Sequence, residues 1–220
     1  MKKAAGLIVL SAACLMAASF WQKPYAEWSD KEVNKMLNDS PWAKSTSIEM
    51  SFPGSDVAPL PGGGGNGPQG GGGGFTPPSL EIQAIIESAL PVRQALVRRK
   101  FGAEAGKSED ARKILNEEPK SYEIVLSGPL GMFVMGPPDQ VSKNLTEVTS
   151  LSSAKSGAIK PEKIEVSKPG RTMEVLFVFP RTMPFTVEDQ EVEFATKLGK
   201  SNLRYKFRLK DMVVNGKLEM

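Results

Sequence analysis

Polar and apolar residues alternate most regularly over 191–198 and 203–210, two segments near the end of the chain. Folding one against the other across the loop 199–202 places Phe194 opposite Phe207 on an apolar face. The same register pairs Glu193 with Arg208, and Glu191 with Lys210, on the other face. Apolar pairs on one side and opposite charges on the other are what a half-buried antiparallel hairpin requires. The pattern therefore predicts such a hairpin, and Asn215-Gly216 predicts a second, tight one.

Elsewhere, short alternating or continuous apolar runs mix with helical periodicities in no regular order. Strands are expected at 45–52, 80–87, 122–126, 164–166 and 173–179, the last of them apolar on both faces and therefore central. Apolar residues at helical spacing follow four polar starting residues, which are Ser29, Ser88, Ser108 and Asp139. This irregular order predicts an α+β fold: a largely antiparallel sheet with three or four helices packed on it.

A glycine-rich stretch at 53–79 interrupts the pattern, with ten glycines among the thirteen residues 62–74. Such a composition buries little apolar surface, so we expect a disordered loop. The helix and strand expected at 27–52 are too short to fold alone, which favours a loop inside a single domain over a linker between two. We therefore assign 27–52 and 80–220 to one main domain.

The first nineteen residues have the pattern of a signal peptide. Lys2 and Lys3 precede an unbroken run of apolar and small residues, Ala4 to Ala18, and small residues end the run at Ser19. We expect export to the periplasm or the extracellular space, with cleavage near Ser19. Two alternatives attach the protein to a membrane: lipidation at Cys14, or an uncleaved leader.

Composition excludes several classes of chemistry. The chain has no histidine, and its single cysteine is Cys14, inside the expected leader. The mature chain therefore cannot use Ser-His-Asp or Cys-His catalysis, nor zinc sites built from His or Cys. Removing Lys2 and Lys3 from 28 basic residues against 25 acidic ones leaves it close to neutral. We expect no cofactor, no nucleotide and no nucleic-acid partner.

Two strings look catalytic and have simpler interpretations. The segment 102–108 is like a phosphate-binding loop, but its glycines are one residue too close, and we expect a helix–helix turn capped by Ser108. Ser152-Ser153-Ala154-Lys155 has the Ser-x-x-Lys spacing of penicillin-interacting enzymes. It lies in a serine-rich stretch that we interpret as a solvated loop.

Charged and aromatic clusters are also weighed against ordinary structural roles. The acidic group Glu188, Asp189, Glu191 and Glu193 lacks the spacing of a calcium loop. The basic row Arg204, Lys206, Arg208 and Lys210 could bind an acidic polysaccharide, lipopolysaccharide or nucleic acid, but we interpret it as a charged solvent face. Trp28 and Trp42 could line a sugar cleft, and we expect them to pack against the sheet.

The candidate partner or ligand site is a short apolar run between turn-forming residues. It comprises Leu130, Met132, Phe133, Val134 and Met135, bracketed by Gly128-Pro129 and Gly136-Pro137-Pro138. Such a loop either tucks into the core or stays exposed to receive a partner or an apolar ligand. Both alternatives remain open at this point.

Several strings resemble a group of exported bacterial proteins of unknown function. They are Trp28–Val33 (WSDKEV), Ser40–Lys44 (SPWAK), Glu87–Arg93 (ESALPVR), Val178–Arg181 (VFPR) and Lys206–Met212 (KFRLKDM). Members of that group also carry a glycine-rich insertion after the first strand. The resemblance implies export and a single domain, and it implies no activity or functional residue.

Three functional hypotheses follow. The first is a non-enzymatic envelope or periplasmic protein that binds another macromolecule or organises the cell surface. The second is a hydrolase or lyase that works without histidine, for which the polar residues near element ends are Glu87, Arg93, Tyr122, Arg181 and Glu188. The third is a carrier of lipids or other apolar ligands, built on the loop from Leu130 to Met135.

Overall fold

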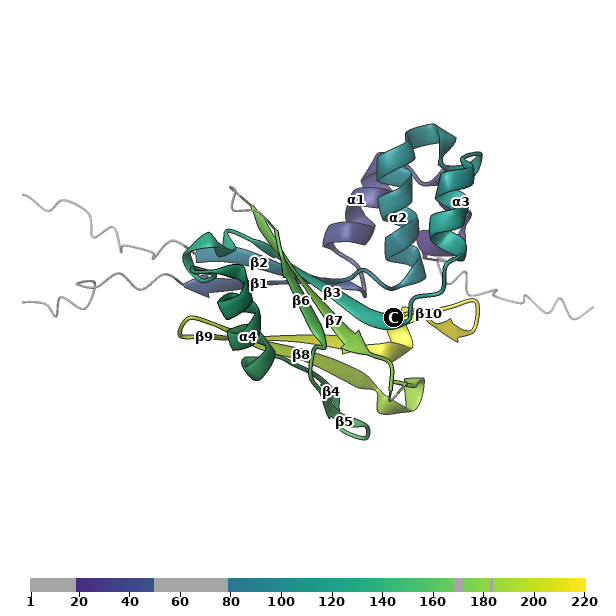
Figure 1. Ribbon diagram of the computed structural model, residues 1–220. Helices are drawn as coiled ribbons and strands as arrows, with labels where there is room; N and C mark the ends of the chain where they lie inside the picture. The colour runs from purple at the N-terminus through teal and green to yellow at the C-terminus, as the bar shows by residue number, and fades with distance from the viewer. Residues whose placement is uncertain (1–18, 50–78, 168–171, 183) are drawn as a thin grey trace, which may run out of the picture.

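The computed structural model describes residues 19–49, 79–167, 172–182 and 184–220 (Figure 1). These residues form four α-helices and eleven strands in antiparallel sheets, which confirms the α+β class. The expected signal peptide, apart from Ser19, and almost all of the glycine-rich stretch lie outside the described residues. A turn at Pro169-Gly170, which the sequence predicts between the strands expected at 164–166 and 173–179, also lies outside them.

The larger sheet has five antiparallel strands in the order β1-β2-β3-β7-β6. Their bounds are β1 Ala43–Glu49, β2 Ser79–Ile86, β3 Ser121–Gly128, β6 Lys163–Val166 and β7 Met173–Pro180. The segment between β1 and β2 connects neighbouring strands, since Glu49 is the register partner of Ser79. The insertion therefore joins two paired strands of one sheet.

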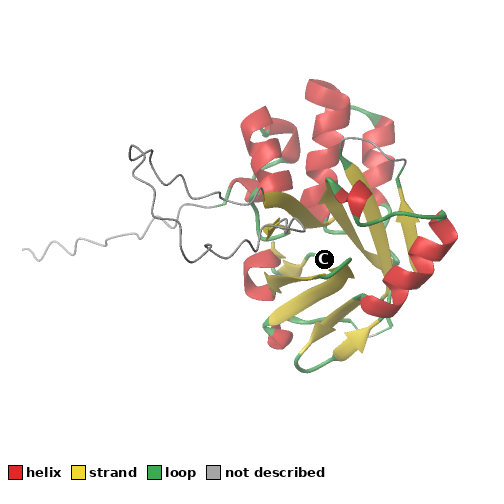
Figure 2. Ribbon diagram, turned by 90° about the vertical axis from the view of Figure 1, so that its left-hand side faces the viewer, coloured by secondary structure: helices red, strands yellow, loops and turns green. Residues whose placement is uncertain are grey.

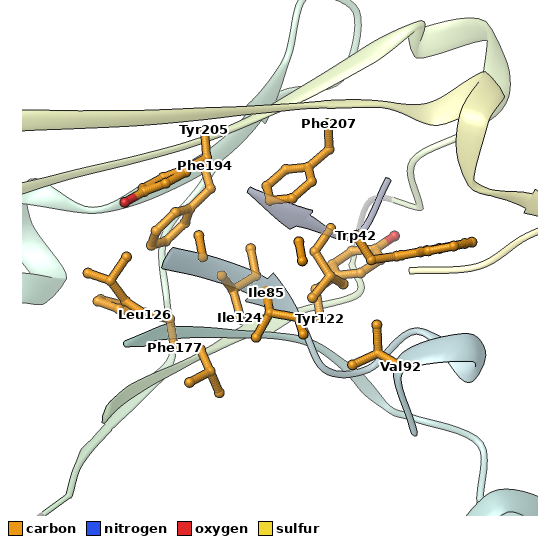
Figure 3. Close-up of a cluster of buried hydrophobic side chains, with 14 of the residues drawn as sticks. Trp42, Ile85, Val92, Tyr122, Ile124, Leu126, Phe177, Phe194, Tyr205 and Phe207 are labelled. Carbon is orange, nitrogen blue, oxygen red and sulfur yellow. The ribbon is translucent and has the colours of Figure 1, made fainter. Parts of the chain in front are cut away.

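A second sheet of four strands, in the order β5-β4-β8-β9, faces the first (Figure 2). Its strands are β4 Ser150–Ser153, β5 Gly157–Ile159, β8 Glu191–Leu198 and β9 Ser201–Arg208. The core fills the space between the two sheets: the ring centroids of Phe177 and Phe194 are 5.2 Å apart, edge to face (Figure 3). The Tyr205 hydroxyl donates a hydrogen bond across this space to the Ile82 carbonyl at 3.0 Å.

The β8–β9 hairpin exists, but its predicted register is wrong by two residues. Phe194 pairs with Tyr205 instead of Phe207, because the connection is the two-residue turn Gly199-Lys200 instead of a four-residue loop. Gly199 has φ +57°, a conformation that favours glycine at the first position of such a turn. A shift of two residues keeps every side chain on its predicted face, since strand side chains repeat with period two.

Three other expectations need correction. The strand β7 is buried on one face only, and its other face is half-buried at Leu176 and Val178. The serine-rich stretch predicted as a loop forms the β4–β5 hairpin. Ser88 does not cap the following helix, because its hydroxyl accepts a hydrogen bond from the Glu123 amide at 3.1 Å.

Helices lie around the two sheets. Three of them, α1 (Asp30–Asn38), α2 (Leu90–Phe101) and α3 (Glu109–Asn116), stand side by side at one end (Figure 1). Ser29 and Glu32 form the predicted capping box of α1, and Ser108 caps α3 as predicted. The fourth, α4 (Pro138–Val148), packs against β6 and β8.

Short elements complete the fold. The predicted turn at Asn215-Gly216 joins β10 (Val213–Val214) to β11 (Lys217–Leu218), with positive φ at both turn residues. The 3-10 turns are η1 (Phe20–Gln22), η2 (Tyr25–Glu27), η3 (Gly102–Gly106), η4 (Leu130–Met132), η5 (Val187–Asp189) and η6 (Leu209–Met212). The indole nitrogen of Trp42 donates to the Glu219 carbonyl at 2.7 Å and so ties the β10–β11 ribbon to the start of β1.

Candidate functional site

The apolar loop from Leu130 to Met135 divides into buried and exposed residues. Leu130 and Val134 are buried in the core, and Phe133 is half-buried against it. Met132 and Met135 are 48% and 78% exposed. The loop is therefore divided: two side chains anchor it in the core, and two methionines face the solvent.

This loop forms one wall of a surface groove of about 330 Å³, which we call the α4 groove. The opposite walls come from α4 and from the β8–β9 turn. Its lining residues are Phe133, Val134, Met135, Val141, Asn144, Leu145, Val148, Lys197 and Gly199. The β8–β9 turn lies close to the loop: a Cβ atom added at Gly199 would lie 3.5 Å from the Phe133 ring.

Val148 lines the α4 groove, but the sequence does not identify it as a candidate site residue. Its spacing from Val141 and Leu145 predicts a buried helical stripe, and those two residues are indeed buried. Val148 is 44% exposed, because α4 ends there and the chain turns into β4. A position in the last turn of a helix is the signal that could have marked it as a surface residue.

The one charged residue that lines the α4 groove is basic. Lys197 lines it, and Lys200 is exposed in the adjoining turn. Among the described residues, neither lysine forms an ion pair with a carboxylate. The groove thus combines an apolar floor with positive charge at one side, which suits an apolar group that has a negative neighbour.

A second cavity system, which we call the polar cleft, lies where α2 and α3 meet the end of the larger sheet. Two adjoining pockets of about 470 and 420 Å³ share Ser88, Arg93 and the segment 117–119 in their linings. Four of the five residues named for a histidine-independent enzyme come together at this end. Glu87 and Arg93 line the first pocket, Arg93 and Arg181 line the second, and the Tyr122 ring lies under the Arg181 guanidinium at 4.4 Å.

The fifth residue, Glu188, lies elsewhere. It lies in η5 and forms an exposed ion pair, at 3.6 Å, with Lys155 in the β4–β5 turn. Its place in the hypothesis is taken by Glu123, which lines the polar cleft beside Glu87. The pairing of β2 with β3 creates this neighbourhood, since the Glu87 amide donates to the Glu123 carbonyl at 2.8 Å.

Burial raises the pKa of the Glu87 carboxyl above its ordinary value. The carboxylates of Glu174 and Glu123 act in the same direction, and Arg99 opposes them. A half-buried carboxyl of this kind holds its proton to higher pH than a solvated one. This is the property of a general acid, and also of an acidic residue kept in an unfavourable place by packing.

The three other candidate enzyme residues at this end, Arg93, Arg181 and Tyr122, are engaged in holding the fold. The Arg93 guanidinium donates to the Ile114 carbonyl, which ties α2 to α3. Arg181 donates to the carbonyls of Ser121, at 3.1 Å, and Met220. The Tyr122 hydroxyl accepts a hydrogen bond from the Phe185 amide at 3.0 Å. Each of these groups already has a partner inside the protein.

Asp189 has a structural role that accounts for serines in and beside the Ser-x-x-Lys string. Its carboxylate accepts hydrogen bonds from the hydroxyls of Ser153 and Ser156, and from the amide and hydroxyl of Thr186. Burial raises its pKa, but these hydrogen bonds outweigh burial and hold the pKa at about 2. These hydrogen bonds join the β4–β5 turn to η5. The two serines therefore stabilise a carboxylate that holds the fold together.

The basic row on β9 separates into two parts. Arg204 and Lys206 form ion pairs with Glu193 and Glu191 at 2.7 and 2.8 Å. Those pairs are diagonal across the hairpin, in place of the predicted ones, because of the shifted register. Arg208 and Lys210 lie beyond them, at the end of the strand and in η6.

The tryptophans belong to the core. Trp28 and Trp42 are fully buried, as the packing interpretation expects, so neither offers a face to a sugar. Phe20 and Trp21 pack on them edge to face, with ring centroids 5.4 and 5.6 Å apart. The first described turn of the chain is therefore part of the packed structure.

Within the described ranges, no group of three or more acidic, cysteine or histidine side chains is placed to hold a metal ion. None of the described helices has the length and apolar character needed to cross a membrane. Comparison of the chain with protein-family models, with curated proteins and with solved structures finds no match.

Proposed function

We propose that this protein is an exported binding protein of the cell envelope and that it holds a segment of a partner protein in the α4 groove. One observation carries the proposal. Of the five large apolar side chains that are exposed in the described structure, two (Met135 and Val148) line this groove, and a third (Met132) lies in the same short loop as Met135. Clustered exposed apolar groups mark interaction sites, and methionine adapts to varied apolar surfaces.

The chemistry of the groove defines the partner segment. A volume of about 330 Å³ takes one or two apolar side chains. Lys197 and Lys200 favour acidic residues next to them. The segment proposed is thus a short peptide stretch in which a leucine, methionine or phenylalanine is flanked by aspartate or glutamate.

Peptide selection tests this directly. A displayed random-peptide library is selected against the purified mature chain, and affinities of the enriched peptides are measured by fluorescence anisotropy. Enriched sequences should combine an apolar residue with acidic neighbours. The double variant Met135→Ser/Val148→Ser should weaken their binding at least tenfold, because it removes the apolar contacts of the groove.

The matched control is Ile114→Ser, which removes an exposed apolar side chain next to the polar cleft. It should leave peptide affinity unchanged. Equal losses in the control, or no enriched peptide, would contradict the proposal. Tight binding of a fluorescent fatty acid, competing with the peptides, would instead support the lipid-carrier hypothesis.

The compartment is a separate part of the proposal. Phe20 and Trp21 pack on the buried tryptophans, so cleavage near Ser19 leaves every core residue of the described structure in the mature chain. Mass spectrometry of the periplasmic and culture fractions should find a chain that begins close to Phe20. A soluble cytosolic chain that still begins at Met1 would contradict export.

The polar cleft favours a second candidate, a hydrolase that uses Glu87 as general acid. The raised pKa of Glu87 and the adjacent Glu123 carboxylate are the observations that favour it. Purified protein is tested on panels of glycoside, ester and peptide substrates. Turnover that disappears in Glu87→Gln would establish this function, and its absence from all panels would eliminate it.

A further inference from the structure

A third cavity, which we call the basic cleft, lies at the far end of the β8–β9 hairpin from the α4 groove. It has a volume of about 550 Å³ and is lined by Val187, Gln190, Glu191, Arg208 and Lys210. The cleft is bounded by η5, the start of β8 and the passage from β9 into η6. None of its residues lines the α4 groove or the polar cleft.

The basic cleft has an excess of positive charge, which Arg208 and Lys210 supply. Its one carboxylate, Glu191, is neutralised by Lys206 at 2.8 Å. Arg208 and Lys210 are exposed, and no carboxylate of the described residues forms an ion pair with either. They are therefore available to an external anion, unlike Arg204 and Lys206 in the same row.

Gln190 adds an unusual backbone to the cleft. Its φ of 63° and ψ of −52° fall in a sparsely populated region that is strained for a residue with a side chain. Its carbonyl accepts a hydrogen bond from the Leu209 amide at 2.9 Å, which joins the start of β8 to η6. Glycine would adopt this conformation with less strain, so the position carries an exposed amide side chain at an energetic cost.

We propose that the basic cleft binds an acidic oligosaccharide by its carboxylate. The guanidinium of Arg208 matches a carboxylate with two parallel donors, and Lys210 adds a second positive charge. The Gln190 amide offers both donors and an acceptor for sugar hydroxyls. The exposed Val187 side chain gives an apolar contact for the C–H face of a sugar ring. The choice of a glycan as the source of the carboxylate rests on the proposed export.

The other polyanions are less suited to this cleft. Recognition of anionic membranes uses clusters of about four to eight basic residues, and proteins that bind DNA tightly neutralise about six to ten phosphates. Two unpaired cations in a concave site are too few for either surface. They suffice for one carboxylate held together with its sugar ring.

The test uses the full mature chain and isothermal titration calorimetry with the trisaccharide of galacturonic acid. Binding is expected, and Arg208→Gln/Lys210→Gln should weaken it at least tenfold. The control Lys31→Gln/Lys113→Gln makes the same change in net charge on exposed helical positions and should bind as the original chain does. The neutral trisaccharide of galactose should bind at least tenfold more weakly than the acidic one.

Several results would overturn the proposal. They are absence of binding, equal weakening in the two double variants, equal binding of the neutral sugar, and stronger binding to phosphatidylglycerol vesicles than to the trisaccharide. Gln190→Gly separates binding from folding: it should raise the midpoint of thermal unfolding while weakening trisaccharide binding. Met135→Ser/Val148→Ser should bind the trisaccharide normally, so failure here is distinguishable from failure of the α4 groove.

Discussion

The polar cleft and the α4 groove differ in what their side chains do for the fold. Arg93 and Arg181 line the first, and each donates to backbone carbonyls that join separate elements. Met135 and Val148 line the second and remain exposed to solvent. The two arginines of the polar cleft thus hold elements of the fold together, whereas the exposed apolar side chains of the α4 groove remain available for contact with a ligand. The groups of a cavity that lack partners inside the protein are therefore the ones available to a ligand.

Truncating the anchor of the apolar loop should give the largest effect on stability. Leu130 is fully buried, so Leu130→Ala removes packed atoms and leaves a cavity in the core. We expect a loss of about 3 kcal/mol in the free energy of unfolding, measured by urea denaturation. Met135→Ala, five residues on, should change the unfolding free energy by less than about 0.5 kcal/mol. Comparable losses in the two variants would remove the division between anchoring and exposed residues.

Arg181→Met should have the next largest effect. The substitution keeps most of the side-chain volume but leaves the carbonyls of Ser121 and Met220 without this donor and removes the cation over the Tyr122 ring. We expect destabilisation of about 2 kcal/mol in urea denaturation. The exposed Lys120→Met, which lines the same cleft, serves as the control and should be nearly neutral. An unaffected Arg181→Met would mean that the arginine is free for a ligand after all.

Asp189 is a third case, a carboxylate whose two oxygens both accept hydrogen bonds inside the protein. It gives a pH-dependent prediction. Its pKa of about 2 in the folded state lies below its ordinary value of 3.8. The ionised carboxylate therefore stabilises the fold above about pH 4, and this contribution is lost as the pH falls through about 2. Asp189→Asn should cost about 1–2 kcal/mol at pH 7, with a difference from the original chain that shrinks toward pH 2. Thermal unfolding across this pH range measures it, and a pH-independent difference would contradict the assignment.

Local patterns in the sequence predict much of this fold for identifiable reasons. The capping box at Ser29 and the turn at Asn215-Gly216 depend on residues that are close in sequence, and both are confirmed. The faces of β8 and β9 are also correct, because period-two alternation survives a shift of register. The exact pairing is not, since it depends on the two-residue turn that Gly199 permits.

Features set by distant contacts are the ones that sequence reasoning misses. Ser88 has the right type and place for a helix cap, yet β3 supplies the Glu123 amide that occupies its hydroxyl. The serines near Lys155 look like a catalytic string until Asp189 approaches from a segment more than thirty residues away. Likewise the loop at Leu130–Met135 is predicted, but its groove needs α4 and the β8–β9 turn, which only the tertiary structure brings to it.

Glu87→Gln should have the smallest effect on the free energy of unfolding, and it tests whether the polar cleft has a catalytic role. The folded-state pKa of Glu87 is raised, so its proton-bound form is the stabilising one. That contribution is fully present below the ordinary pKa of 4.5 and is lost as the pH rises through the folded-state value. Glutamine mimics the protonated carboxyl, and the variant should therefore be slightly more stable than the original chain at pH 7 and equally stable at pH 3.

Urea denaturation at the two pH values measures this difference, with the exposed Glu118→Gln as a control from the same cleft. A gain at pH 7 without any change in substrate turnover would mean that packing alone keeps Glu87 in an unfavourable environment. A gain accompanied by lost turnover would show stability exchanged for catalysis, as strained active sites do. The polar cleft would then be a working site as well as a junction, and the contrast with the α4 groove would lie in the kind of ligand each one takes.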